Sequence, residues 1–193
     1  MRFNKRFPRT SIAALLVVFV LSAVSFAKNH ESNFPNIKIS NFGQMDDNFY
    51  RGARPKVQDF RNLAALGIKT VIDLTDNSRE REQPAVEAAG MRYVNIAIVD
   101  KDSPSADQIS AFLKVANDPA TGKFYVHCAG GRHRTGVMGA IYRFNHDHWN
   151  YEQAYAEMKD YDFYTSNGHG KQLDFIQNYW QQIQANQATA VKR

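Results

Sequence analysis

Short apolar runs and longer helical patterns alternate along the chain. Three runs rich in β-branched and aromatic residues predict strands, at 69–74 (KTVIDL), 91–98 (MRYVNIAI) and 123–128 (KFYVHC). The stretch NFYRGARP predicts a further strand ahead of Pro55. Runs of this length, bounded by polar segments and glycines, are typical of strands that are buried in a sheet.

Between the strands, apolar residues recur at the spacing of amphipathic helices. Gly67 ends the first of these helices and Gly90 ends the second, which covers 79–89, because glycine commonly closes a helix. The apolar face of the first helix consists of Val57, Phe60, Leu63 and Leu66. The later helices have apolar positions at Ile109, Phe112, Leu113 and Ala116; at Val137, Met138, Ile141 and Phe144; at Ala154, Tyr155 and Met158; and at Leu173, Ile176, Tyr179, Trp180 and Ile183.

Two helix starts carry an additional local signal. Ser105 with Gln108, and Asn150 with Gln153, have the spacing of capping boxes. Strands and helices in this alternating order predict an α/β fold, with a central, mostly parallel sheet of four to five strands flanked by helices.

The first 27 residues have the pattern of an export signal. A basic start is followed by an apolar run over 12–24 and then by the small residues Ser25 and Ala27. The run is short for a membrane span, although an uncleaved anchor is the alternative. The sequence predicts a signal peptide over 1–27 and a periplasmic or secreted protein, with no stable membrane insertion after cleavage.

The net charge of +5 comes mainly from this leader. The chain has 24 Lys and Arg against 19 Asp and Glu, and four of the basic residues but none of the acids lie in 1–27. The remainder carries 20 basic and 19 acidic residues, so the pI near 9.3 is no evidence for a nucleic-acid partner. Residues 28–185 suit one domain, and 186–193 are polar and predicted to form a flexible tail.

The single cysteine lies in the segment VHCAGGRHRTG, residues 126–136, where a predicted strand ends and a helix begins. Ligands of parallel sheets bind beyond this end of the strands. Gly130 and Gly131 let backbone N–H groups converge, and the helix start near Arg134 adds its positive dipole end. This field should lower the pKa of the Cys128 thiol from ~8.5 toward about 3.5–7.5, which favours a thiolate nucleophile.

The neighbours of Cys128 complete an oxyanion site. Arg134 can hold two phosphoryl oxygens with its planar fork, and Thr135 can donate a hydrogen bond to the thiolate. His127 is expected to brace the loop through backbone bonds. The residues expected to line the substrate are Ala129, Gly130, Gly131, Arg132, His133 and Thr135.

This pattern, H-C-x5-R-[ST], resembles the signature of the cysteine-dependent protein tyrosine and dual-specificity phosphatase superfamily. GRHRTG is similar to the plant and fungal atypical dual-specificity phosphatases, and YRGARP (50–55) and GIKTVIDL (67–74) resemble stretches of exported bacterial relatives. The resemblance covers about 48–164. It implies a dual-specificity phosphatase-like fold, a cysteinyl-phosphate intermediate, and neither a metal nor a cofactor.

The resemblance also implies a general acid on a separate loop, an aspartate often followed by proline four residues later. The segment VDKDSPSADQI offers Asp100, Asp102 and Asp107. Asp100 has the proline spacing, Asp102 remains the alternative, and Asp107 suits the first turn of a helix.

The sequence leaves the substrate open among phosphotyrosine proteins, phosphoserine or phosphothreonine proteins, inositol phosphates and small phosphate esters. Arg132 and His133 either face outward and pair with acids or meet further phosphates of a polyanion. Arg51 and Arg54 either flank the pocket or form structural pairs.

Three alternative interpretations carry less weight. A rhodanese-type sulfurtransferase would normally lack the helix start RTG, and a non-catalytic phosphate-binding module would usually have lost Cys128 or Arg134. His127 and Cys128 have no second close Cys/His pair for a metal site, and HDH (146–148) is expected to end a helix. The segment NGHG (167–170) is expected to be a turn before the last helix.

Overall fold

The computed structural model describes residues 34–190, so the predicted leader over 1–27 lies outside the described residues. Five strands form one sheet in the order β1-β2-β5-β3-β4. β2 (Phe49–Ala53), β5 (Lys123–Cys128), β3 (Ile68–Asp73) and β4 (Arg92–Asn95) are parallel. β1 (Gly43–Gln44) pairs antiparallel with β2, and at two residues it is too short to show a hydrophobic period. The predicted α/β fold with a mostly parallel sheet is confirmed.

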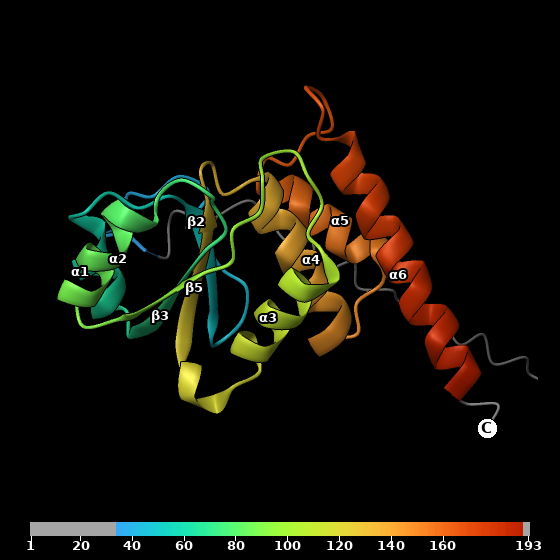
Figure 1. The fold of residues 1–193 in the computed structure, drawn as a ribbon, viewed down its shortest axis with the longest axis horizontal. Helices are drawn as coiled ribbons and strands as arrows, with labels where there is room; N and C mark the ends of the chain where they lie inside the picture. The colour runs from blue at the N-terminus through green and yellow to red at the C-terminus, as the bar shows by residue number, and fades with distance from the viewer. Residues whose placement is uncertain (1–33, 191–193) are drawn as a thin grey trace, which may run out of the picture.

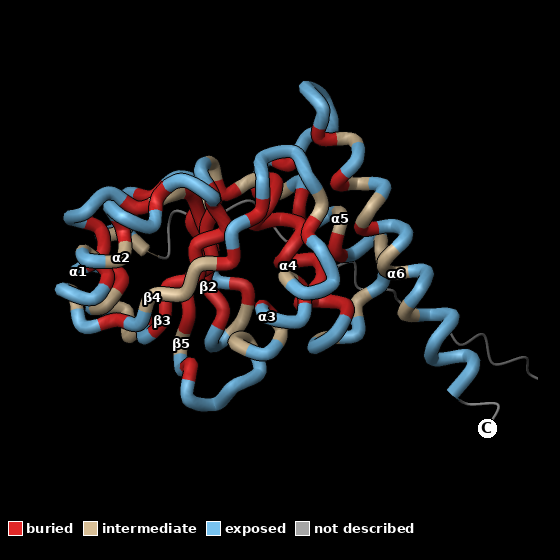
Figure 2. Tube along the Cα trace, in the orientation of Figure 1, coloured by how far each residue is buried: buried red, intermediate tan, exposed pale blue. Residues whose placement is uncertain are grey.

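Helices cover both faces of the sheet (Figure 1). On one side lie α1 (Asp59–Ala65) and α2 (Arg79–Ala88). On the other side lie α3 (Ala106–Ala116), α4 (His133–His146), α5 (Tyr151–Asp160) and α6 (Gly170–Ala190), with a short 3₁₀ turn at Pro119–Thr121 before β5. Figure 2 shows the buried residues concentrated in the strands and in α4, which is the most deeply buried helix.

The central strand β5 divides its side chains between two apolar clusters. Phe124, Val126 and Cys128 belong to the cluster on the side of α3 to α6, whereas Tyr125 belongs to the cluster under α1 and α2. Because successive side chains of a strand point to opposite faces, Cys128 faces α4 and His127 faces α2. The reactive thiol and the residue before it are therefore placed on opposite sides of the sheet.

The local signals for helix ends hold in the structure. Both predicted capping boxes are formed, at Ser105 and at Asn150. Gly67 and Gly90 follow the first two helices with φ of +87° and +78°, a backbone conformation that favours glycine. Residue 148 follows the end of α4, as expected for HDH.

Two expectations from the helical pattern differ from the structure. Val57 precedes α1 and is 69% exposed, so it is not part of the apolar face that Phe60 and Leu63 form. Residues 186–190, which were assigned to the tail, continue α6 as exposed helical turns. Alanine and glutamine are good helix formers and favour these additional turns.

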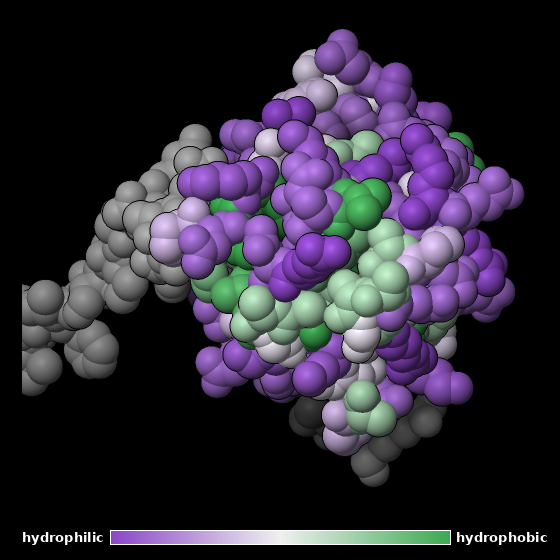
Figure 3. Space-filling model, turned by 90° about the vertical axis from the view of Figure 1, so that its left-hand side faces the viewer, coloured by the Kyte–Doolittle hydropathy of each residue, from purple (hydrophilic) through white to green (hydrophobic). Residues whose placement is uncertain are grey.

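Figure 3 views the side of the molecule that bears α1 and α2, where a small group of apolar side chains lies among hydrophilic ones. Within residues 34–190, none of the helices has the length and hydrophobicity that a membrane span requires.

Candidate active site

The loop between β5 and α4 is held from outside by its carbonyl groups. The Ala129 oxygen accepts a hydrogen bond from the Arg54 backbone N–H (3.2 Å), and the Gly130 oxygen accepts one from Asn41 Nδ2 (2.9 Å). The Gly131 oxygen accepts one from Arg51 Nη2 (2.7 Å). With the carbonyls turned outward, the N–H groups of the loop lie on its inner side, as a site for an oxyanion requires.

Gly131 is required by the close approach of this loop to β2. Its φ is +68°, and a Cβ atom there would lie 2.4 Å from the carbonyl carbon of Gly52 and 2.5 Å from the nitrogen of Ala53. Both neighbours are backbone atoms, which cannot move aside as a flexible side chain can. The loop therefore holds its shape against a glycine in the adjacent strand.

Cys128 is 3% exposed and lies at the bottom of the loop. Burial by itself raises the pKa of the thiol. The neighbouring Thr135 hydroxyl and N–H, the charge of Arg134 and the Gly131 N–H together outweigh burial and lower the pKa of Cys128 below its usual value. The Thr135 hydroxyl is buried and has no other hydrogen-bond partner among the described residues, so it is free to donate to the thiolate.

Arg134 points from the first turn of α4 toward the loop between β4 and α3. Its Nη1 donates to the Ile98 carbonyl at 3.0 Å, and its Nη2 lies 3.4 Å from Asp100 Oδ1. Asp76, which follows β3, lies 3.8 Å from Nη1. The Arg134 side chain is almost buried, at 7% exposure.

Asp100 lies on a tight turn beside this arginine. The Asp102 N–H donates to the Val99 carbonyl at 3.2 Å, which closes a four-residue turn with Asp100 and Lys101 at its centre. Lys101 has φ of +67°, a conformation that costs a non-glycine residue roughly 1–2 kcal/mol. Asp100 is brought to Arg134, whereas no contact of the Asp102 carboxylate with Arg134 is found. Asp107 lies in the first turn of α3, as expected.

The His127 side chain lies between two carboxylates, and its carbonyl accepts a backbone hydrogen bond from the Leu74 N–H at 2.9 Å. Its Nε2 lies 3.1 Å from Glu82 Oε2, and its Nδ1 lies 3.8 Å from Asp73 Oδ1, with all three side chains buried. Glu82 also pairs with Arg54 Nε at 2.9 Å. These four polar side chains, Arg54, Glu82, His127 and Asp73, form a row beneath the loop between β5 and α4, on the face opposite to Cys128.

Asp73 is the most heavily hydrogen-bonded acid of this network. Burial raises its pKa, but the charge of His127 and hydrogen bonds from Ser78, Tyr93 and Thr75 lower the pKa overall. Asp73 therefore stays ionised. The sequence offered no local signal for Asp73 or Glu82, because they are distant from residue 127 along the chain.

Arg51 and Arg54 are structural residues, not residues of the pocket mouth. Arg51 is fully buried behind the loop, where its guanidinium stacks on the Tyr161 ring at 3.9 Å. Arg54 Nη2 donates to Thr75 and Asn77. The interpretation as structural pairs is confirmed for both.

Arg132 and His133 have different surroundings. Arg132 is 42% exposed and faces Asp162 at 3.9 Å, at the edge of a shallow hollow of about 510 Å³ that Lys159, Phe163 and Tyr164 also line. His133 is buried, and burial and the neighbouring His169 lower its pKa to about 4. His133 is thus neutral at pH 7 and adds no positive charge to the pocket wall.

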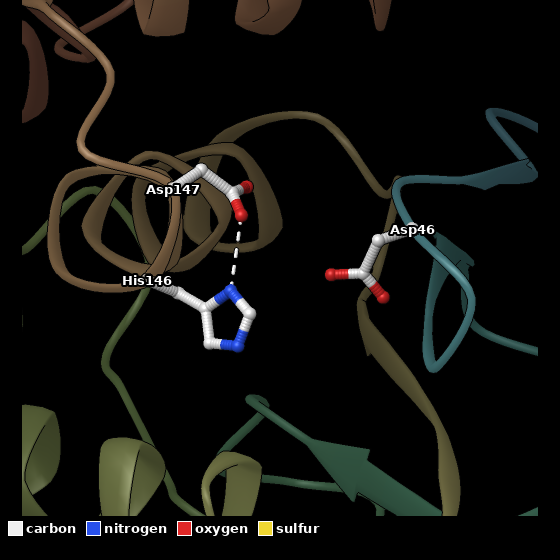
Figure 4. Close-up of side chains that lie close together, drawn as sticks. All are labelled: Asp46, His146 and Asp147. Carbon is white, nitrogen blue, oxygen red and sulfur yellow. Dashed lines mark hydrogen bonds and ion pairs between the residues drawn. The ribbon is translucent and has the colours of Figure 1, made fainter.

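Among the described residues, two groups of side chains have the composition of metal ligands. One is the buried set formed by Asp73, Glu82 and His127. The other, shown in Figure 4, is formed by Asp46, His146 and Asp147 at the end of α4. In the second group, Asp46 already accepts a hydrogen bond from Tyr142, and Asp147 accepts hydrogen bonds from Arg143 and His146. The second group thereby ties the end of α4 to the loop before β2.

The fold and this site together define a class of protein. A buried thiol with a lowered pKa, a phosphate-sized loop of N–H groups and an adjacent arginine at a helix start are the parts of a cysteine-dependent phosphatase of the tyrosine and dual-specificity type.

The comparisons with known proteins agree. Residues 25–178 match the family described as PTP-NADK, a DSP-PTPase phosphatase fused to NAD+ kinase, and the chain belongs to this family of phosphatases. It is 29% identical over 104 residues to the inositol diphosphatase DSP3 of Arabidopsis thaliana, and the matched region covers 51% of each chain. It is 26% identical over 119 residues to the dual specificity protein phosphatase TpbA of Pseudomonas aeruginosa, covering 62% of this chain and 53% of the relative.

Solved structures agree with the fold. The core catalytic domain of the PP-IP phosphatase SIW14 from S. cerevisiae superposes with a TM-score of 0.62 at 20% identity, over 72% of this chain and 85% of that one. The chain spans about half the length of the two curated relatives named above.

Proposed function

We propose that this protein hydrolyses phosphate monoesters through a cysteinyl-phosphate intermediate. The observation that carries the proposal is the buried Cys128 thiol, whose pKa is lowered by hydrogen bonds from the loop that would bind the phosphate. The same N–H groups and Arg134 that favour the thiolate also attract a phosphoryl group to it. Membership of the phosphatase family supports this assignment.

The reaction follows in two steps. The Cys128 sulfur attacks phosphorus, while Arg134 and the loop N–H groups hold the three equatorial oxygens. The bond to the leaving oxygen breaks as Asp100 gives that oxygen its proton. Asp100 then removes a proton from water, the water oxygen attacks phosphorus, and the thiolate leaves with a hydrogen bond from Thr135.

The proposal is tested with the purified chain on para-nitrophenyl phosphate and on phenyl phosphate, whose leaving group is poorer. Cys128→Ser should abolish turnover while tungstate still binds, because the cradle consists mostly of backbone. Asp100→Asn should lower kcat by about 10²–10³ on phenyl phosphate and less on the nitrophenyl ester. An active Cys128→Ser protein would refute the mechanism.

Two matched controls decide the identity of the acid. Asp76→Asn removes the other carboxylate near Arg134, and Asp102→Asn removes the alternative on the same loop. Both should retain activity within a few-fold of the unchanged protein. A leaving-group effect in either variant, but not in Asp100→Asn, would move the acid to that residue.

The exposed cations beside the loop support a proposal on the substrate class. Arg132 and Lys159 both line the hollow next to the phosphate site. The ion pair of Arg132 with Asp162 is long, at 3.9 Å, so Arg132 is not held tightly by this acid. We infer that these cations contact a second phosphate of a substrate such as an inositol phosphate, the kind of compound that the name of the Arabidopsis relative indicates for that protein. Phosphotyrosine or phosphoserine proteins are the second candidate, supported by the name of the Pseudomonas relative.

Arg132→Ala distinguishes the two candidates. It should lower kcat/KM on an inositol polyphosphate by about tenfold, the value of one partly exposed charge pair with a phosphate, and leave para-nitrophenyl phosphate within twofold. Equal losses on both substrates would show that Arg132 only shapes the loop.

A further inference from the structure

The turn that carries Asp100 is anchored at both ends. At its start the Ile98 carbonyl accepts from Arg134 Nη1 at 3.0 Å. At its end the Asp102 carbonyl accepts from Gln172 Nε2, also at 3.0 Å. The first anchor belongs to the phosphate site already described. The second comes from the opening turn of α6, which has no part in that site.

Gln172 is fully buried, and both ends of its amide are used. Because the Asp102 carbonyl can only accept, Nε2 must face it, and Oε1 then accepts from Nδ1 of His169 at 3.0 Å. The amide orientation and the histidine tautomer are thereby fixed together. A buried glutamine with two such partners has one position only.

His169 continues the connection to the phosphate loop. Its ring stacks on His133 with the centroids 3.4 Å apart and the planes at 4°. His133 directly precedes Arg134, and its Nε2 lies 3.1 Å from the Tyr164 carbonyl. The low pKa of His133 keeps this ring neutral at neutral pH, so charge repulsion does not separate the two rings.

The turn also packs against the segment before α6. Gly168 has φ of +92°, and a Cβ atom added there would lie 3.3 Å from Cδ of Lys101. NGHG is thus the turn that the sequence predicted, but its glycine makes room for the strained residue next to Asp100. Segment 168–172 therefore contacts the turn twice, through Gly168 at Lys101 and through Gln172 at Asp102.

We propose that Gln172 is a positioning residue for the general acid. Through His169 and the stacked His133 it couples the Asp100 turn to the phosphate loop, so that the carboxylate stays over the leaving oxygen. The inference rests on the proposed function, in which Asp100 is the acid. When Gln172 is lost, the turn retains its anchor at Ile98 but swings away at Asp102, and protonation of the leaving group becomes slower.

The test compares Gln172→Met with Gln177→Met, a matched change at an exposed glutamine of the same helix. Gln172→Met should lower kcat about tenfold on phenyl phosphate and less than twofold on 2,4-dinitrophenyl phosphate, with KM and tungstate inhibition unchanged. Gln177→Met should match the unchanged protein. Equal losses on both esters, or weaker tungstate binding, would mean that Gln172 only supports the fold, and would overturn the proposal.

A double variant separates this proposal from the proposed function. In the Asp100→Asn background, Gln172→Met should cause no further loss, because the residue that it positions is gone. An additional tenfold loss would overturn the positioning role while leaving the phosphatase assignment intact. An inactive unchanged protein, in contrast, would refute the proposed function itself.

A second variant guards against misfolding. His169→Phe keeps an aromatic ring on His133 but removes the donor that orients Gln172. It should reproduce the selective loss on phenyl phosphate to a smaller extent, at an unchanged melting temperature within a few degrees. Full activity of a folded His169→Phe protein on both esters would refute the coupling through the histidine stack.

Discussion

The Thr135 hydroxyl offers the sharpest test of how the site activates its thiol. Thr135→Val keeps the shape of the side chain and removes the hydroxyl that is placed to donate a hydrogen bond to the Cys128 thiolate. A hydrogen bond to a charged group contributes about 1.5–3 kcal/mol, and one pKa unit corresponds to about 1.4 kcal/mol. Because Cys128 is almost fully buried, water does not replace the lost bond. The pKa of the thiol should therefore rise by about 1–2 units.

The assay is the rate of alkylation by iodoacetamide as a function of pH, checked by the ultraviolet absorbance of the thiolate. Thr70→Val is the matched control, since Thr70 is equally buried and donates to the Thr121 carbonyl far from the site. It should lower stability without moving the thiol pKa. A rise of less than about 0.5 units in Thr135→Val, or an equal rise in the control, would refute the assignment of the hydroxyl.

Two further predictions concern stability. Gly131→Ala should lower the free energy of unfolding by at least about 2 kcal/mol more than Gly90→Ala does. Both glycines have positive φ, but a Cβ atom at 131 would meet backbone atoms, whereas nothing lies within 4 Å of a Cβ atom at 90. Equal losses in urea unfolding would contradict the close approach of Gly131 to Gly52. The pKa of His133 is lowered to about 4 from 6.5, so the unfolded chain binds an extra proton between these values and the free energy of unfolding should fall as pH drops from 6.5 to 4. His133→Phe should reduce the total fall over this interval by up to about 2 kcal/mol, and an unchanged fall would show that the ring is not kept neutral by burial.

The parts of the site that sequence reasoning found are those written within a few consecutive residues. The segment 126–136 contains the nucleophile, the cradle and the arginine, and the alternation of patterns places it at the end of a buried strand. Capping boxes at Ser105 and Asn150 are equally local, since each needs only two residues three positions apart. Such signals can be read from the sequence because they depend only on residues that are close together along the chain.

The parts that sequence reasoning missed join positions far apart in the chain. Glu82 meets His127 only because α2 packs beneath β5, and Gln172 meets Asp102 only because α6 begins above the acid turn. Neither residue stands in a recognisable pattern, and glutamine and glutamate on helices are usually exposed. Val57 shows the opposite error: it has the right spacing for an apolar face but lies before the helix begins.

The isolation of Cys128 from any other thiol determines how the enzyme recovers from oxidation. A thiolate reacts readily with peroxide to give a sulfenic acid, and an enzyme with a second cysteine nearby traps that species as a disulfide. These 193 residues contain no second cysteine. Within these residues the sulfenic acid can condense only with a backbone nitrogen, so formation of a mixed disulfide needs a thiol from outside them. The enzyme's return to activity therefore depends on the reductants of the surroundings and on whether the oxyanion cradle is occupied, since a bound phosphate blocks access to the sulfur.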